Sequence, residues 1–264
     1  MSTPDCERPG AKADQDRGRW RAAFVAHLLG AAALGLMIAG CAPRTSQERS
    51  AAESGDVSVT PIMHASIQIE YGGKVIQVDP TSQGDYSQAK QADLVLVTDI
   101  HGDHLDPSAI SRIRKPGAPV VAPAAAAPQI ENATVLANGE SKLVAGIQLE
   151  AVPMYNLQRG PEPGQLFHPK GRGNGYILTL GSKRVYIAGD TECTPEMRAL
   201  KNIDMAFLPM NLPYTMPPAE AAECARAFKP KVVYPYHYRG QNTEEFKTAL
   251  AGEPIEVRLL NWYP

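Results

Sequence analysis

Residues 93–104 read DLVLVTDIHGDH, a short apolar run followed directly by a cluster of acidic and imidazole side chains. The apolar run Asp93 to Val97 predicts a buried strand, and the polar cluster predicts the loop that follows the strand. Imidazole nitrogens and carboxylate oxygens together suit zinc or a similar divalent ion. The alternative is a surface loop with two incidental histidines, but rigid scaffolds tend to present functional residues on loops of this kind.

Similar short apolar segments recur along the chain and predict further strands. These segments are 66–70, 75–79, 120–122, 147–152, 176–180, 184–188, 205–209 and 232–236. Gly72 and Gly73 predict a tight hairpin turn between the first two. Helices are expected at 217–228, which Pro opens, and at 242–250, which begins with an Asn–Thr cap signal. A short helix interrupted at Pro128 is expected within 122–130. Early hairpins and later strand–helix alternation together predict a mixed α/β fold.

Two more predicted strands end on a side chain that can bind a metal. Segment 184–188 is followed by Gly189 and Asp190, and segment 232–236 by His237. A metal ion needs ligands that converge from separate parts of the chain. Three strand-to-loop junctions with Asp or His therefore indicate a metal centre more strongly than one would.

These motifs resemble those of the metallo-β-lactamase-fold hydrolases, especially the branch that includes ascorbate-phosphate lactonase-like enzymes. The resemblance covers about residues 57–263 and implies a four-layer αββα sandwich with its site at the edge of two facing sheets. The motifs that carry it are Met63-His64-Ala65, Val78-Asp79-Pro80, residues 99–104, Gly189-Asp190-Thr191 and Pro235-Tyr236-His237-Tyr238.

The resemblance also implies metal ligands. His101 would belong to a first metal position, Asp103, His104 and His237 would belong to a second, and Asp190 would bridge the two. The family has histidine where this chain has Asp99 and Asn156. The amide is a poor zinc ligand, so the first position is depleted. We therefore expect one tightly held Zn²⁺, with Mn²⁺ or another divalent ion as alternatives, or a pair of ions with a weak first position.

Several nearby residues have more than one possible role. His168 could complete the first metal position, donate a proton or bind substrate, and Tyr155 or Lys170 could stabilise an oxyanion. His64 is either a support for a metal ligand or a core histidine, and Asp79 either holds a ligand imidazole or caps a turn.

The expected reaction is attack by a metal-activated water, held or deprotonated by Asp103, on an ester, lactone or phosphodiester. The chain has no Gly-x-Ser-x-Gly motif, which disfavours a serine hydrolase. The alternative function is a non-catalytic lipoprotein of the cell envelope that binds a metal or another ligand. The departures at Asp99 and Asn156 motivate that alternative.

Residues 1–40 predict an export signal. Three arginines at 17, 19 and 21 precede an apolar stretch that ends in Ala39-Gly40-Cys41. Small residues before a cysteine resemble a lipoprotein signal, with Cys41 lipidated as the mature N-terminus. An uncleaved membrane anchor is the alternative. We expect a linker over 41–56 and a hydrolase domain over 57–264, exported and held on a membrane facing the periplasm or the cell exterior.

Composition restricts the partners and leaves the thiol chemistry open. The chain has 26 Lys and Arg against 28 Asp and Glu, a formal net charge of −2 without a basic stripe. This balance argues against a nucleic-acid partner and leaves a small or lipid-like substrate. Cys193 and Cys224 could pair in an oxidising compartment, but their separation in sequence does not show whether their backbones approach.

Overall fold

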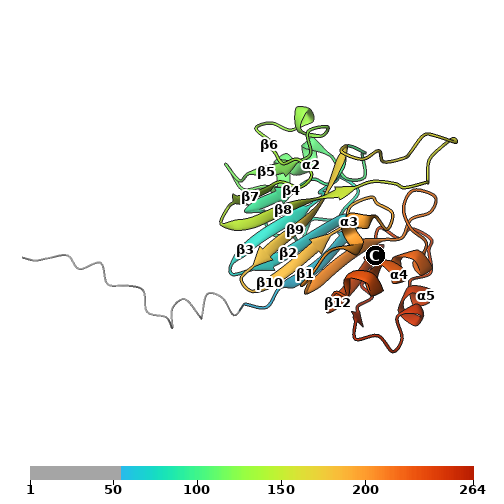
Figure 1. Ribbon diagram of the computed structural model, residues 1–264. Coiled ribbons are helices and arrows are strands. Elements are labelled where there is room, and N and C mark those ends of the chain that lie inside the picture. Colours follow the sequence, from blue (N-terminus) through green and yellow to red (C-terminus); the bar gives the residue numbers. More distant parts are fainter. Residues whose placement is uncertain (1–54) are drawn as a thin grey trace, which may run out of the picture. The chain divides into compact units, whose positions relative to one another are not determined.

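The computed structural model describes residues 55–264, which form a mixed α/β fold with two β-sheets (Figure 1). The predicted fold class is confirmed. The predicted export signal, the lipidated Cys41 and almost all of the predicted linker lie outside the described residues. Across the described part of the chain, no helix has the length and apolar character needed to cross a membrane.

The first sheet has six strands in sequential order. They are β1 (Ser58–Met63), β2 (Ser66–Tyr71), β3 (Lys74–Val78), β4 (Leu94–Leu96), β5 (Val120–Ala122) and β6 (Thr134–Val135). β1 to β3 pair antiparallel, whereas β3 to β6 pair parallel. Gly72 and Gly73 have φ of 56° and 76°, which suits the tight hairpin predicted between β2 and β3.

The second sheet has seven strands in the order β13-β12-β11-β10-β9-β8-β7. They are β7 (Ser141–Val144), β8 (Ile147–Met154), β9 (Gly173–Leu180), β10 (Lys183–Ile187), β11 (Met205–Pro209), β12 (Val232–Tyr236) and β13 (Glu256–Val257). β7 to β10 pair antiparallel and β10 to β13 pair parallel. Strands β10 to β12 therefore end at the same edge of the sheet.

Alternation along the strands divides the apolar residues between an inner core and two outer ones. In β4, Leu94 and Leu96 belong to the core shared with the second sheet, while Val95 packs outward with Ile110 of α2 (Pro107–Ile113). In β11, Phe207 faces the inner core, and its neighbours in sequence face the helices on the other side.

Three helices cover the outer face of the second sheet: α3 (Pro195–Arg198), α4 (Pro218–Phe228) and α5 (Thr243–Ala249). Figure 1 shows α4 and α5 next to each other in the C-terminal part of the chain. With α2 on the first sheet, the layers run helix, sheet, sheet, helix. The short helix expected within 122–130 is a single 3₁₀ turn, η1 (Ala127–Gln129).

The turns at one edge of the sandwich carry residues with unusual backbone geometry. His64, Asp79 and His237 have φ of 53°, 45° and 49°, a region that residues with a Cβ rarely adopt. His237 N donates a hydrogen bond to His64 O, 3.2 Å away, so a turn of the first sheet is joined to the end of β12 in the second. Such strained positions concentrate at functional sites, and this edge carries the polar clusters singled out in the sequence.

Candidate metal centre

Asp190 lies at the middle of a group of imidazoles that come from three separate segments. It is buried, and its Oδ2 lies 3.3 Å from His104 Nε2 and 3.2 Å from His168 Nε2. Its Oδ1 lies 3.3 Å from His237 Nε2. The structure thus brings together four of the residues that the sequence placed at the site.

Asp103 faces the same group from the solvent side. Its side chain is 33% exposed, and its Oδ2 lies 3.5 Å from His237 Nε2 and 3.3 Å from His64 Nε2. His64 was not among the predicted ligands, yet its ring nitrogen points into the centre. Burial is the main cause that lowers the pKa of His64, to about 4. The imidazole is therefore neutral at physiological pH, the form that binds metals.

The centre contains buried polar atoms without hydrogen-bond partners among the described residues. They include Nε2 of His104, Nε2 of His237 and Oδ1 of Asp190. Buried polar atoms are rarely left unsatisfied. The three residues each offer a ligand atom, and these atoms lie within 4.8 Å of one another, close enough to bind one ion. A divalent cation would satisfy all three, so the residues present fit a metal ion.

The electrostatics of the centre favour positive charge. Burial alone would lower the pKa of His104, but the carboxylates of Asp190 and Asp79 outweigh it and raise that pKa well above its usual value. Burial would raise the pKa of Asp190, but His237 and His104 hold it well below its usual range. The carboxylate is therefore ionised and ready to hold a cation.

Asp79 orients His104 from behind. Asp79 Oδ2 lies 2.8 Å from His104 Nδ1, while Thr98 donates to the carboxylate from its backbone N–H at 2.7 Å and its hydroxyl at 2.6 Å. A carboxylate on Nδ1 leaves Nε2 directed at the centre, an arrangement typical of metal-binding histidines. Of the two roles considered for Asp79, the structure shows the support of a histidine.

Asn156 supports His168 rather than facing the centre. Its Oδ1 accepts a hydrogen bond from the backbone N–H of His168 at 2.8 Å and lies 2.7 Å from His168 Nδ1. Its amide nitrogen donates to Glu192 Oε1 and to the carbonyl of Tyr214. The oxygen is therefore already used, which corrects the prediction of Asn156 as a ligand. His168 is the imidazole that reaches the centre here.

Asp99 is engaged by an arginine that the sequence did not single out. Arg172 donates from Nε and Nη2 to the two carboxylate oxygens at 3.1 and 3.0 Å, and His101 Nδ1 lies 2.9 Å from Oδ2. Burial raises the pKa of Asp99, but the hydrogen bond from His101 and the charges of His104 and Arg172 lower it to about 2. The guanidinium neutralises this carboxylate and would repel a cation. The group Asp99, His101 and His168 is thus a weaker metal position than the one around Asp190.

A cavity of about 450 Å³ opens beside the centre. It is lined by His64, His101, Asp103, Pro161, Leu166, Phe167, His168, Asp190, Asn211, Tyr214, His237 and Arg239. Tyr155 and Lys170 are not among the lining residues. The Tyr155 hydroxyl donates to Glu196 at 2.9 Å, and Lys170 pairs with the same carboxylate. This geometry corrects the prediction that either residue faces the substrate.

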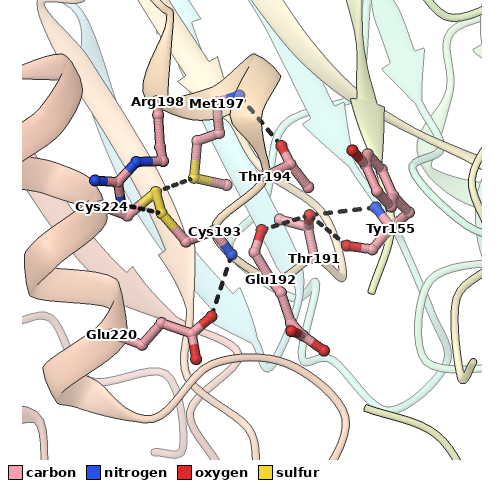
Figure 2. The surroundings of a disulfide bond; sticks show 9 residues. All are labelled: Tyr155, Thr191, Glu192, Cys193, Thr194, Met197, Arg198, Glu220 and Cys224. Carbon is pink, nitrogen blue, oxygen red and sulfur yellow. Dashed lines mark hydrogen bonds between the residues drawn. A yellow bond between two sulfur atoms is a disulfide. The ribbon is translucent and has the colours of Figure 1, made fainter. Parts of the chain in front are cut away.

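Cys193 and Cys224 form a disulfide, one of the alternatives left open by the sequence. Figure 2 shows the bond joining the loop that follows Asp190 to helix α4, with Glu220 of α4 accepting from the backbone N–H of Cys193 at 3.3 Å. In the same loop the Thr191 hydroxyl donates to the carbonyl of Tyr155 at 3.0 Å. The segment next to Asp190 is therefore held on two sides.

Comparison with known proteins identifies the family. Residues 58–237 match the family described as β-lactamase superfamily domain. A UPF0173 metal-dependent hydrolase of Methanopyrus kandleri is 31% identical over 222 residues, 76% of this chain and 96% of the relative. One from Thermococcus kodakarensis is 34% identical over 223 residues, 77% of this chain and 96% of the relative.

A solved structure agrees with these relatives. A candidate metal-dependent hydrolase from Parabacteroides distasonis superposes with a TM-score of 0.73 at 44% identity, over 78% of this chain and 93% of that one. The chain therefore belongs to the UPF0173 metal-dependent hydrolases of the β-lactamase superfamily, and it is a metal-dependent hydrolase with the metallo-β-lactamase fold.

Proposed function

We propose that this hydrolase cleaves an ester, lactone or phosphodiester, with one Zn²⁺ or similar divalent ion held by His104, Asp190 and His237. The convergence of unsatisfied Nε2 and Oδ1 atoms from these three residues carries the proposal. A bound divalent ion lowers the pKa of a water ligand toward neutrality and polarises the scissile bond.

Asp103 is the residue best placed to handle the attacking water. Burial raises its pKa, but the imidazoles of His237 and His64 close to the carboxylate hold that pKa well below the usual range. The carboxylate is thus ionised, lines the cavity and can accept a hydrogen bond from a water on its open side, which would orient that water for attack. His64 and His237 fix its orientation through the contacts at 3.3 and 3.5 Å.

A single tightly bound ion is the stoichiometry that the contacts support best. Arg172 neutralises Asp99, and the remaining groups at the first position are His101, which is half exposed, and His168. By contrast, no lysine or arginine of residues 55–264 forms an ion pair with Asp190, whose close partners are imidazoles. Occupation of the first position would therefore be weaker, and His101 and His168 remain available to line the substrate cavity.

We also propose that the enzyme works outside the cytoplasm as a lipoprotein attached through Cys41. The disulfide between Cys193 and Cys224 supports this location, because such bonds persist in oxidising compartments. Membrane attachment favours substrates from the cell envelope, such as acyl esters and phosphodiesters. Lactones stay in the proposed set because of the resemblance to lactonase-like enzymes.

The test is hydrolysis of bis(4-nitrophenyl) phosphate and of a panel of lactones and acyl esters. We expect turnover that chelation removes and added Zn²⁺ or Mn²⁺ restores, and loss of turnover in His104→Ala and Asp190→Asn. Asp85→Asn is the matched control, since Asp85 is fully exposed to solvent. Undiminished turnover in a folded Asp190→Asn variant would refute the assignment. A bound metal without turnover on any member would favour the binding-protein alternative.

A further inference from the structure

Besides its histidines, the cavity beside the metal centre is lined by one arginine and no lysine among the described residues, and that arginine is Arg239. Other basic side chains nearby are already paired. Arg159 pairs with Glu192 at 3.1 Å and Glu220 at 2.7 Å, and Arg172 pairs with Asp99. Within residues 55–264 the Arg239 guanidinium has no hydrogen bond or ion pair, and the residue is exposed.

The backbone of Arg239 is anchored next to the centre. Arg239 lies two positions after His237, and its backbone N–H donates to the Tyr263 hydroxyl at 2.9 Å. The same hydroxyl lies 2.6 Å from His64 Nδ1. Arg239 is therefore tied at its base to a histidine of the centre while its guanidinium remains free at the cavity.

Aromatic and apolar side chains form another part of the cavity lining. The rings of Phe167 and Tyr214 meet edge to face with centroids 4.9 Å apart, and Leu166 and Pro161 line the cavity with them. Tyr214 is 45% exposed, so part of its ring is accessible to a bound molecule. The cavity thus offers an apolar surface, a cation and the centre together.

We infer that Arg239 binds an anionic group of the substrate, and that the substrate is an amphipathic ester or lactone whose apolar part packs on Phe167 and Tyr214. The inference rests on the proposed function and narrows its substrate class. A guanidinium suits this task because its fork of N–H donors matches a carboxylate or phosphate oxygen pair. A neutral substrate of the same shape would leave the guanidinium without a partner.

Binding can be tested apart from turnover with two fluorescent probes that share one aromatic skeleton. 8-Anilinonaphthalene-1-sulfonate carries a negative charge, and N-phenyl-1-naphthylamine is its neutral counterpart. We expect the mature protein to prefer the anionic probe, and Arg239→Gln to reduce that preference by about tenfold. Phe167→Ala should weaken the binding of both probes.

Arg112→Gln is the matched control, because Arg112 is an exposed arginine of α2 away from the cavity. It should leave both affinities unchanged. A preference that is absent in the native protein, or that survives in Arg239→Gln, would overturn the inference.

A kinetic comparison separates this inference from the proposed function. Mono-4-nitrophenyl glutarate and 4-nitrophenyl valerate differ in a terminal carboxylate, and Arg239→Gln should lower kcat/KM for the first about tenfold and leave the second unchanged. Failure to hydrolyse any substrate, combined with an Arg239-dependent probe preference, would reject hydrolysis and keep the anion site. Hydrolysis with equal loss for both esters, or with no loss for either, would reject the anion site and keep the hydrolase.

Discussion

Removal of the disulfide between Cys193 and Cys224 should lower the free energy of unfolding by an amount set by the length of chain between the two cysteines. The two cysteines are 31 residues apart. Closing a loop of this length removes conformational entropy from the unfolded chain equivalent to about 4 kcal/mol at 25 °C. A single domain is commonly stable by only about 5–15 kcal/mol, so the bond would supply a large share of the stability.

The assay is equilibrium unfolding in guanidinium chloride, comparing the oxidised protein with the Cys193→Ala/Cys224→Ala variant and with the native sequence under reductant. The reduced native protein controls for packing, because it keeps both sulfur atoms. We expect the midpoint to fall by roughly 1 M in both cases. Equal midpoints for the oxidised and reduced proteins would refute the reasoning that this bond restricts the unfolded chain.

Three further predictions concern the groups around the centre. Asn156→Ala should lower kcat/KM by about tenfold or more, because His168 lines the cavity and loses the acceptor of two N–H groups, while Asn156→Asp keeps that acceptor; equal kcat/KM values for all three proteins would contradict it. Tyr155→Phe should change kcat/KM by less than about twofold, because Tyr155 does not line the cavity. A large loss of kcat/KM would show that Tyr155 takes part in the reaction. The pKa of Asp99 is about 2 in the folded protein, against 3.8 for an ordinary aspartate. Its ionised form therefore adds about 2 kcal/mol to the free energy of unfolding above pH 4, and this contribution disappears as the pH falls toward 2. In urea unfolding, Arg172→Gln should therefore be less stable than the native protein at pH 6 and about as stable near pH 2. A stability difference between the two proteins that grows as the pH falls would rule this out.

The strands of the two sheets were the part of the fold most open to prediction. The predicted bounds of β5, β11 and β12 match the structure, because each is a short buried run with clear ends. β7 was missed since three of its four residues are exposed and its pairing with β8 decides its conformation. α2 was missed although Asp106 and Pro107 give a cap and a proline at its first position.

The sequence predicted that the centre lies where several strands end. It did not predict which side chains of the centre contact one another. Parallel strands place Asp190 and His237 at one edge of the sheet. The apolar segments before these two residues predicted the strands, and so predicted that the two side chains lie close together. Asn156 stands where the resemblance implies a histidine, and only the geometry shows that His168 is the side chain that faces the centre. The pair between Asp99 and Arg172 joins residues 73 positions apart, which no local pattern indicates.

His64 illustrates a second limit. A buried core histidine and a histidine that contacts Asp103 have the same sequence signature, an imidazole on a strand flanked by small residues. The structure separates them because His64 lies in a left-handed turn after β1, with its two ring nitrogens directed at Tyr263 and Asp103. This contact with Tyr263 also places a residue from the C-terminal part of the chain next to a histidine of the centre.

The proposed function requires His104, Asp190 and His237 to hold a divalent ion, and the metal content per chain shows whether they do. The measurement is elemental analysis of the purified protein after exhaustive dialysis, beside the Asp190→Asn variant and the Asp85→Asn control. We expect about one equivalent of a divalent metal in the native protein and in the control, and far less in the Asp190→Asn variant. Metal-free native protein that still hydrolyses its substrate, or full metal content in Asp190→Asn, would contradict it.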